Sequence, residues 1–533
     1  MAIRKIKNVP AVEFDFEIPK EVRAVAGLLG MNGFAAYLVG GCLRDLLLKR
    51  VPKDWDIATS AKPEEIQKLF SSFAEATEDK PATIYENEFG TVGIKTRSED
   101  PTLAVVEVTT FRKDGKYSDS RHPDKITFAK TIEEDLGRRD FTCNAIAAEL
   151  ITNNSLPITG NSDSHKSSVI SHQLGLVDPF NGLRDIEAKM IRAVGEPEKR
   201  FEEDALRLMR AVRFETQLGI SNGWRIEETT GEAIRKLAGK LSLIAHERVR
   251  DEFEKIIMSR DASDGIRRLE DIGLLQHIIP ELREGIDCGQ NKHHIYTVFE
   301  HNVRALEHAA KEGYSLDVRL ASLLHDVGKP KTKRGEGVNS TFYGHQVVGE
   351  RMSREILSRL HFPKAVIDRV ALLVREHMFM YDPDVVSIAG VRRLVKRVGA
   401  ENMDALLEVR EGDRIGSGVP KARPYRIRHL EAMIEKAKTD PISPKMLAVN
   451  GTDLMKELKV TPGPRLGKMI AILLEDVLED TGMNDRKKLI MKAQKLNEMS
   501  DRELDALGKK AREAAEGAQE RVDEGIKKKY FVS

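Results

Sequence analysis

The sequence predicts an α/β domain followed by a mostly helical body, and three observations carry this prediction. The segment that starts at Leu38 reads as a short buried strand, which ends in Gly40-Gly41 at the start of a helix. Residues 103–110 are rich in β-branched side chains, as strands are. From about residue 176 the apolar residues recur at helical spacing. Because the chain has 533 residues, we expect several domains.

The first motif of the α/β domain is a pair of aspartates, Asp54 and Asp56, at the start of a second predicted strand. Residues two apart on a strand point to the same face, so two carboxylates would lie side by side. Such a pair repels unless a cation lies between the two groups, and Mg²⁺ prefers oxygen ligands. A lone Asp-x-Asp is usually a surface pair, but here Gly40-Gly41 and Arg44 precede it and supply phosphate-binding groups. The combination indicates metal-assisted nucleotidyl transfer from a nucleoside triphosphate.

A third carboxylate, Glu107, lies inside the predicted strand 103–110 in an apolar setting. Burying a charge without a partner is costly, so its presence there calls for a reason. Beside Asp54 and Asp56 it would complete a three-carboxylate site of the kind that supports in-line displacement with two metal ions. The alternative is a glutamate on an edge strand that faces water.

Two further segments complete this domain. Residues 111–123 form a polar loop punctuated by Gly and Pro, and residues 132–147 read as a helix with a strongly charged start. Together these segments resemble the head domain of the class II (bacterial-type) CCA-adding tRNA nucleotidyltransferase and poly(A) polymerase family. That family has a polymerase-beta-type nucleotidyltransferase head. The resemblance implies that Asp54 and Asp56 bind Mg²⁺ and that Glu107 is the third catalytic carboxylate. It also implies that the Arg-Arg-Asp motif at 138–140 contacts the ribose and the triphosphate.

The resemblance continues into a helical neck. Residues 178–185 match the family's hinge between head and neck, and residues 200–214 read as one amphipathic helix that places Asp204 and Arg207 on one face. The plain interpretation is a surface ion pair of little energetic worth. The resemblance implies instead a protein template, in which Asp204 accepts from the exocyclic amine of C or A and Arg207 donates to the ring nitrogen. U and G present the opposite pattern and would leave buried groups unpaired.

The nucleotide-binding residues that the resemblance implies come from both segments. They are Gly40, Gly41, Arg44, Arg138, Arg139, Asp140, Asn144, Asp204, Arg207, Arg210 and Arg213. In the family the loop that matches residues 111–123 helps to switch the pocket from C to A. Its Asp-Gly-x-Tyr and Arg-His-Pro elements are present, which argues against a variant that adds only C.

A second constellation of possible metal ligands lies in the helical body. Its members are His301, His325, Asp326, His345, His377 and Asp413. A single helical histidine is more often a satisfied structural residue, but imidazoles and carboxylates spread over several helices suit a transition-metal site of Mn, Ni or Fe. Their order resembles that of the HD phosphohydrolase superfamily. We expect the first three and Asp413 to bind one metal, and His345 and His377 to support a second.

These features divide the chain into six predicted parts. They are a head at 1–150, a flexible insertion at 151–175, a neck at 176–289, an HD domain at 290–420, a helical tRNA-binding body at 421–497 and a charged tail at 498–533. In the body, a Gly- and Pro-rich turn precedes a helix that carries Arg465 and Lys468, which suits phosphate contacts. The alternative, in which these helices only pack together and contact no RNA, is almost as well supported by the sequence.

The resemblance implies an enzyme that acts on tRNA with ATP and CTP, and the composition is compatible with one in the cytoplasm. The 86 basic and 85 acidic residues give a net charge of +1, which neither supports nor opposes RNA binding, because only one face must be positive. The three cysteines form no Cys-x-x-Cys pair and predict buried thiols in a reducing compartment. No apolar run predicts a signal peptide or a membrane span.

The function expected from these motifs is the addition of CCA to tRNA 3′ ends, with release of pyrophosphate and a possible additional phosphohydrolase activity of the HD domain. Within the family, the alternatives are a poly(A) polymerase and a specialist that adds only A. From other classes, the alternatives are a metal-dependent phosphohydrolase that repairs RNA ends and a catalytically silent RNA-binding protein. The three carboxylates count against both.

Overall fold

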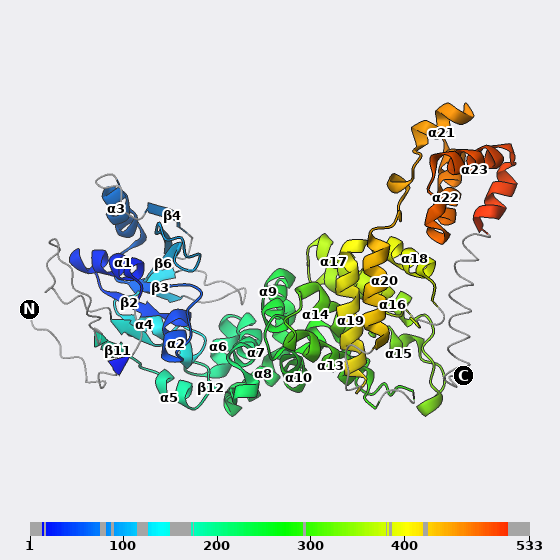
Figure 1. Ribbon diagram of the computed structural model, residues 1–533. Helices are drawn as coiled ribbons and strands as arrows, with labels where there is room; N and C mark the ends of the chain where they lie inside the picture. The colour runs from blue at the N-terminus through cyan, green and yellow to red at the C-terminus, as the bar shows by residue number, and fades with distance from the viewer. Residues whose placement is uncertain are drawn as a thin grey trace, which may run out of the picture. The chain divides into compact units, whose positions relative to one another are not determined.

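The computed structural model divides the chain into two compact units, Met1–Ile278 and Ile279–Ser533, and each is considered by itself (Figure 1). The structure describes residues 13–14, 18–74, 82–86, 90–114, 126–149, 172–173, 175–291, 295–379, 381–382, 386–418 and 425–509. Among the helices of these residues, none is long and apolar enough to cross a bilayer. Cys42, Cys143 and Cys288 are buried and free of disulfides, as expected.

The first unit is built on one mixed sheet of seven strands. In spatial order the strands are β11 (Gly175–Val177), β9 (Ala147–Glu149), β2 (Ala36–Val39), β3 (Asp56–Thr59), β6 (Val105–Thr110), β5 (Thr91–Lys95) and β4 (Ala82–Glu86). Neighbouring strands are antiparallel except β3 and β6, which run parallel. One edge of the sheet is therefore β11, which begins at the last residue of the predicted insertion.

Alternating burial explains why β6 forms where it does. Val106 and Val108 are fully buried, whereas Glu107 between them is exposed. Helices α1 (Lys20–Met31), α2 (Gly40–Leu47) and α3 (Pro63–Ala74) accompany the sheet (Figure 1). The predicted sequence of strand, Gly-Gly and helix is present as β2 and α2.

The prediction of one helix over 132–147 is wrong. Helix α4 covers only Ile132–Leu136, a 3₁₀ turn covers Thr142–Asn144, and β9 follows. Between α4 and the 3₁₀ turn, the Asp140 carboxylate accepts the N–H of Phe141 at 2.9 Å, a local hydrogen bond that competes with helical hydrogen bonding. The residues after this turn pair with β2 instead.

The prediction of one helix over 200–214 is also wrong. Helix α6 (Pro197–Glu203) ends before Asp204, and α7 (Leu206–Leu218) begins after it. Asp204 has an extended backbone with φ −142° and ψ 107°, and its carboxylate accepts the Leu206 N–H at 3.0 Å. This local hydrogen bond satisfies a donor at the start of α7 and stabilises the break. Asp204 and Arg207 therefore do not share one helix face.

Further helices complete the first unit. They are α5 (Gly182–Glu187), α8 (Glu228–Leu237), α9 (His246–Ile257), α10 (Ala262–Asp271) and α11 (Leu275–Ile278). The short strand pairs are β1 (Glu13–Phe14) with β10 (His172–Gln173), β7 (Arg112–Asp114) with β8 (Ile126–Phe128), and β12 (Met190–Ile191) with β13 (Arg225–Ile226).

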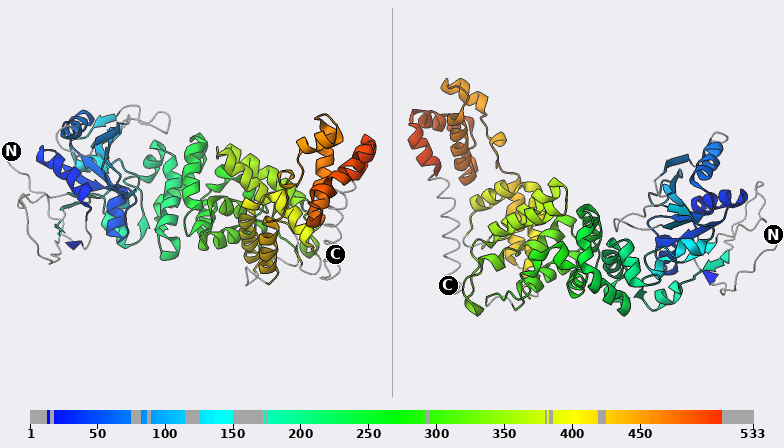
Figure 2. Two further views of the ribbon diagram at one scale, coloured as in Figure 1. Left: turned by 45° about the horizontal axis from the view of Figure 1, so that its top comes forward. Right: turned by 180° about the vertical axis from the view of Figure 1, so that it is seen from behind.

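Among the described residues of the second unit, the regular elements are helices, apart from one isolated β-bridge between Arg334 and Thr341. Its helices are α12 (Pro280–Arg283), α13 (Val298–Lys311), α14 (Leu316–Leu324), α15 (Lys329–Thr332), α16 (His345–Arg359), α17 (Lys364–Glu376), α18 (Ile388–Val398), α19 (Met403–Gly416), α20 (Tyr425–Lys438), α21 (Gly451–Leu458), α22 (Pro464–Glu479) and α23 (Arg486–Glu498). Figure 2 shows α13 to α19, drawn from green to yellow, as a packed bundle in both views. Helices α13, α14, α16, α17 and α19 make its main helix pairs.

Residues 447–507 have a separate apolar core in which Leu454, Leu473 and Leu489 are fully buried. Leu504 is 1% exposed in the same core, so residues 501–509 are a packed helix, although the charged tail was predicted to start at 498. Arg465 and Lys468 contact the carboxylates of Asp501 and Asp505. The two basic residues that were expected to meet phosphate therefore face acidic partners from this last helix.

Candidate active site and metal centre

Two of the head carboxylates meet on neighbouring strands. Asp56 is the first residue of β3 and pairs in register with Glu107 of β6. Asp54 lies two residues before β3, in a bend, so the expectation that both aspartates lie on the strand is wrong. Asp54 and Asp56 nevertheless line the same cleft. Glu107 lies on an interior strand of the sheet, so the alternative of an edge-strand glutamate does not hold.

The electrostatics of Asp56 favour a cation at this position. Burial and the neighbouring charge of Asp54 raise the pKa of Asp56 to about 7, while Arg139 opposes the rise and Glu107 adds to it. A carboxylate with a raised pKa next to other carboxylates gains most from a bound cation. The oxygen donor set suits a hard divalent ion such as Mg²⁺.

The Gly-Gly turn leaves room beside these carboxylates. Gly40 has φ +72°, and a Cβ built there would lie 3.1 Å from Arg139 Nη1 and 3.3 Å from Asp56 Oδ2. A side chain at Gly41 would meet Arg44 Nη2 and Asp54 Oδ1, each at 3.8 Å. Glycine at both positions therefore keeps the start of α2 open next to two arginines and two carboxylates.

A buried carboxylate orients the two arginines of the Arg-Arg-Asp motif. Asp135, on α4, is 1% exposed and accepts from Arg138 Nε at 3.0 Å and from Arg139 Nη2 at 3.3 Å. It also accepts the backbone N–H of Arg112 at 3.2 Å, at the start of β7. Asp135 thus joins both arginines to the base of the loop at 111–123. Residues 115–123 of that loop lie outside the described part of the chain.

The third member of the motif, Asp140, connects head to neck within the first unit. Its Oδ2 accepts from Arg210 Nε at 2.7 Å, and Asn144 Nδ2 donates to its Oδ1 at 3.4 Å. Burial would raise the pKa of Asp140, but the charges of Arg210 and Arg207 outweigh burial and lower it to about 2. Asp140 is therefore an ionised anchor for the start of the neck.

Arg44 and Arg213 are also held in place. Arg44 Nη1 donates to Asn144 Oδ1 at 2.8 Å, and Arg213 pairs with Glu252 at 3.0 Å. Arg44 and Arg213 both lie over the ring of Phe214, with their guanidinium carbons 5.3 Å and 4.1 Å from its centroid.

The break between α6 and α7 displays the two residues of the expected template. Arg207 Nη1 donates to Glu203 at 2.6 Å, and its Nη2 donates to the Arg138 carbonyl at 3.2 Å. Asp204 contacts Arg248 of α9, whose Nη2 lies 2.9 Å from its Oδ2. Each carboxylate oxygen can accept more than one hydrogen bond, so Asp204 keeps capacity for a further donor.

The site residues of the head and neck that were expected from the sequence, except Glu107, line one polar cleft of about 1020 Å³. Its lining includes Gly40, Gly41, Arg44, Asp54, Asp56, Arg138, Arg139, Asp140, Asn144, Asp204, Arg207, Arg210, Arg213 and Arg248. The cleft thus brings together every nucleotide-binding residue that was expected from the sequence.

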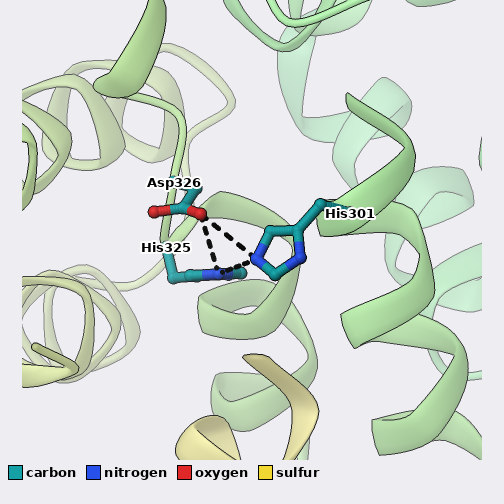
Figure 3. A group of neighbouring side chains, drawn as sticks. All are labelled: His301, His325 and Asp326. Carbon is teal, nitrogen blue, oxygen red and sulfur yellow. Dashed lines mark hydrogen bonds and ion pairs between the residues drawn. The ribbon is translucent and has the colours of Figure 1, made fainter. Parts of the chain in front are cut away.

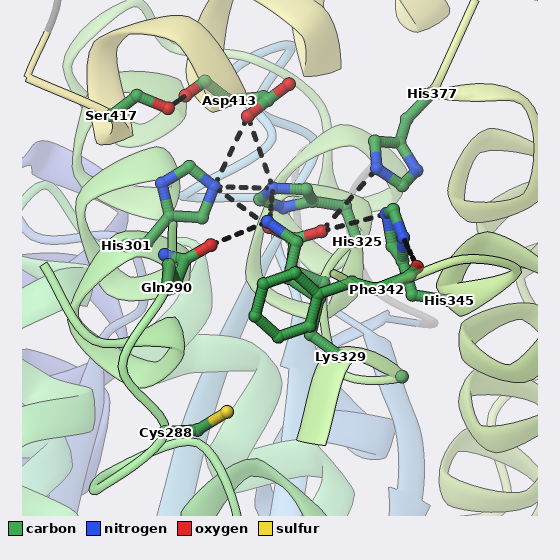
Figure 4. A network of polar contacts seen from close by, with 12 residues as sticks. Cys288, Gln290, His301, His325, Lys329, Phe342, His345, His377, Asp413 and Ser417 are labelled. Atoms are coloured by element: carbon green, nitrogen blue, oxygen red, sulfur yellow. Dashed lines mark hydrogen bonds and ion pairs between the residues drawn. The ribbon is translucent and has the colours of Figure 1, made fainter. Parts of the chain in front are cut away.

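The second constellation converges on one buried carboxylate, Asp326, in the second unit (Figures 3 and 4). Its Oδ2 lies 3.1 Å from His301 Nε2 and 3.4 Å from His325 Nε2. Its Oδ1 lies 3.3 Å from His345 Nε2 and 3.7 Å from His377 Nε2. Asp326 therefore stands between two pairs of imidazoles, and each pair can form a metal-binding group with it.

Hydrogen bonds fix how these imidazoles face the centre. The Nδ1 atoms of His345 and His377 each contact a backbone carbonyl at 2.7 Å, which leaves Nε2 as the metal-facing nitrogen. Both Nε2 atoms are buried and lack a hydrogen-bond partner among the residues described. His325 is held in the same way by the Ser322 carbonyl at 2.8 Å. This donor set fits a divalent transition metal.

Asp413 and Lys329 complete the cluster (Figure 4). Asp413 Oδ1 lies 3.3 Å from His301 Nε2, and Lys329 Nζ lies 2.6 Å from Asp326 Oδ2. Burial opposes protonation of His325, but Asp326 and Asp413 outweigh it and raise the pKa of His325 to about 10. Burial lowers the pKa of His377 to about 4.

Four residues of these sites were not among the expected ones: Asp135, Arg248, Lys329 and Gln290. Gln290 accepts from Lys329 at 2.6 Å. Lys329 follows Asp326 by three residues, so helical spacing could have indicated it. Arg248 is 44 residues from Asp204, and no local pattern indicates that pairing.

Comparison with known proteins assigns the family. The Poly A polymerase head domain matches residues 36–192, the probable RNA- and SrmB-binding site of polymerase A matches 223–286, and the HD domain matches 298–415. A CCA-adding enzyme of Enterococcus faecalis is 30% identical over 486 residues, covering 89% of this chain and 96% of that protein. The chain belongs to the CCA-adding tRNA nucleotidyltransferase family. This confirms the family and the fold class predicted from the sequence.

The chain is also similar to a second curated relative and to a solved structure. An A-adding tRNA nucleotidyltransferase of Deinococcus radiodurans is 35% identical over 364 residues, which cover 66% of this chain and 76% of that protein. The crystal structure of the Bacillus stearothermophilus CCA-adding enzyme in complex with CTP has a TM-score of 0.63 at 26% identity, covering 90% of this chain and 97% of that one. As a member of this family the chain is an enzyme, a nucleotidyltransferase that depends on divalent metal ions.

Proposed function

We propose that this enzyme adds C, C and A to the 3′ end of tRNA, using CTP and ATP. The observation that carries the proposal is the single cleft that joins the head aspartates, the Arg-Arg-Asp motif and the neck residues Asp204 and Arg207. The reaction forms a bond between the terminal ribose 3′-oxygen and the α-phosphorus. It breaks the bond between the α-phosphorus and the bridging oxygen, and pyrophosphate leaves.

The chain's own residues supply position and charge for this reaction. Asp54 and Asp56 would hold Mg²⁺, with Glu107 in support, and Mg²⁺ supplies charge stabilisation for the attacking and leaving oxygens. Arg138 and Arg139 bind the triphosphate, since Asp135 fixes their guanidinium groups toward the cleft.

Selection of the base follows from the hydrogen-bonding polarity of the neck. The Asp204 carboxylate accepts from the amine of C or A, and Arg207, held by Glu203, donates to the ring nitrogen. UTP and GTP offer the opposite groups, which leaves buried polar atoms without partners. The A-adding relative makes addition of A alone the main competing activity.

A second activity is favoured by the buried cluster around Asp326. We infer that His301, His325, Asp326 and Asp413 hold one Mn, Ni or Fe ion and that His345 and His377 support a second, for hydrolysis of phosphate esters. The support is the position of Asp326 between two imidazole pairs and the two metal-facing Nε2 atoms.

A pair of substitutions tests both activities together. We expect Asp54→Ala to abolish nucleotide addition and to leave phosphatase activity and bound transition metal unchanged. We expect Asp326→Ala to remove bound transition metal and phosphatase activity and to preserve nucleotide addition. The measurements are tRNA extension, hydrolysis of a 2′,3′-cyclic nucleotide and metal analysis of the purified protein. If one substitution removed both activities, the two-site model would be wrong.

A further inference from the structure

Part of the cleft wall has no role in the proposed nucleotide site. It contains no acidic residue and comprises Arg50, Val51, Lys53, Gln217, Leu218, Lys255, Met258, Ser259 and Arg260. Its four basic residues, Arg50, Lys53, Lys255 and Arg260, are named here the basic rim. Arg50, Lys53, Lys255 and Arg260 are all exposed. The rim is therefore a positive and accessible border of a cleft whose interior is occupied by carboxylates and paired arginines.

The positive charge of the rim is only partly neutralised within the chain. Lys255 lies 3.4 Å from Glu252, a carboxylate that also binds Arg213. Among the residues that the structure describes, no ion pair joins Lys53 or Arg260 to a carboxylate. These two cations are therefore available to an anion from outside the protein.

Exposed apolar side chains lie among the four cations. Val51 is 86% exposed and Met258 is 44% exposed, and both line the cleft. An isolated exposed apolar residue is ordinary on a protein surface. Alternation of cations with apolar contact points is the chemistry that binds single-stranded nucleic acid, because phosphates meet the charges and bases meet the apolar groups.

The rim adjoins the catalytic carboxylates. Lys53 directly precedes Asp54, and consecutive Cα atoms are about 3.8 Å apart. Arg50 Nη2 donates to the Leu218 carbonyl at 2.8 Å, which joins the segment 50–53 of the head to the end of α7 in the neck. A strand bound along the rim would therefore end next to Asp54.

We propose that the basic rim binds the phosphate backbone of the last nucleotides of the RNA and so delivers the 3′-OH to Asp54 and Asp56. The inference rests on the proposed function for the identity of the reaction, but the binding that it describes can be measured without catalysis. Lys53 and Arg260 make the contacts to phosphate, and Val51 and Met258 contact the terminal bases.

Arg260→Ala and Lys53→Ala test this placement, with Arg260→Lys as the charge-preserving variant and Lys95→Ala as the control. Lys95 is exposed on β5 and does not line the cleft. The probe is a fluorescent acceptor-stem hairpin RNA that lacks the tRNA elbow. Its anisotropy is followed in EDTA, without nucleotide, over a series of salt concentrations.

Each alanine variant at the rim should weaken hairpin binding by about three- to tenfold and lower the slope of log Kd against log salt by about 0.7. Arg260→Lys should retain most of the affinity, and Lys95→Ala should match the wild type. In steady-state extension, the KM for hairpin RNA should rise while the KM for CTP stays within about twofold. Thermal unfolding checks that each variant is folded.

Three results would overturn the proposal. They are an unchanged hairpin Kd in both alanine variants, a rise in the KM for CTP alone, and an effect seen with full-length tRNA but not with the hairpin. The last result would place another part of the tRNA on the rim. Failure of the proposed function would look different, because the wild type would then add no nucleotide to any RNA while the anisotropy measurement still reported binding.

Discussion

At the residue scale, the ionised Asp56 carboxylate lowers the stability of the folded protein, and its expected role in binding metal explains its presence. Its pKa is raised to about 7, by burial first and then by Asp54, so the folded protein binds more protons than the unfolded chain between about pH 4 and 7. The contribution of Asp56 to stability is therefore most favourable at low pH and declines as pH rises through that window. Above pH 7 and without metal, Asp56 is an ionised group that the fold does not fully compensate.

Asp56→Asn should accordingly give an inactive but more stable protein. In EDTA at pH 8 we expect the melting temperature to rise by roughly 2–4 °C, because the uncompensated charge is gone. At pH 4.5 the gain should be clearly smaller. Added Mg²⁺ should raise the melting temperature of the wild type and leave that of Asp56→Asn unchanged. Thermal unfolding at both pH values measures this, with Glu64→Gln on the surface of α3 as the control. A variant that is less stable than the wild type at pH 8 would contradict this account of Asp56.

Site residues that belong to short local motifs could be predicted from the sequence alone. Residues that belong to no motif and contact the site from elsewhere were not predicted. Asp54, Asp56 and the His325-Asp326 dyad stand in short recognisable patterns, and each lies in a cleft or cluster of the structure. Asp135 and Arg248 contact motif residues but belong to no motif themselves. Arg248 meets Asp204 from 44 residues away, a pairing that depends on how separate helices pack and that local spacing does not encode. Asp135 lies three and four residues before Arg138 and Arg139, a spacing that could have indicated it.

At the element scale, the break between α6 and α7 is where base selection is built. A continuous helix was expected because the apolar spacing over 200–214 is helical on both sides of Asp204. The pattern could not show that the Asp204 carboxylate would accept the Leu206 N–H and end the first helix. The break places Asp204 opposite Arg248 and leaves Arg207 in contact with Glu203.

Asp204→Asn should therefore change which pyrimidine is used. The asparagine amide can donate to O4 of uracil, whereas the carboxylate can only accept from the amine of cytosine. We expect the ratio of kcat/KM for CTP to that for UTP to fall by about a hundredfold. Single-nucleotide extension with each triphosphate measures the ratio. Glu202→Gln, an exposed change on α6, serves as the control and should leave it unaltered. An unchanged ratio in Asp204→Asn would remove Asp204 from base selection.

The short helix α4 has a positioning role through Asp135. Asp135→Asn removes the charge that holds Arg138 and Arg139, and breaking a buried ion pair costs about 3–5 kcal/mol. We expect a lower melting temperature and a rise of about tenfold in the KM for CTP, because the arginines lose their fixed direction. Glu134→Gln is the matched control on the same helix, since Glu134 pairs with the exposed Lys113 and should matter little. If Asp135→Asn lost stability but kept the wild-type KM, Asp135 would be structural only.

At the scale of the whole molecule, the chain carries two chemical centres in two separate units. The nucleotide cleft lies within Met1–Ile278, and the cluster around Asp326 lies within Ile279–Ser533. The α/β head and the helical body were predictable because strand and helix periodicities differ. The partners of Arg465 and Lys468 were not, since Asp501 and Asp505 lie more than thirty residues away on a helix that had been assigned to a charged tail.

The central claim is that one cleft adds C, C and A in order, and single-turnover extension of tRNA tests it most directly. Transcripts that end before the CCA sequence, after one C and after two are each mixed with Mg²⁺ and one nucleoside triphosphate, and the products are separated on a sequencing gel. The account predicts addition of two C residues from CTP, then one A from ATP, and then no further growth. Addition of A only to the transcript that ends in CC, or long A tails on any RNA, would contradict it.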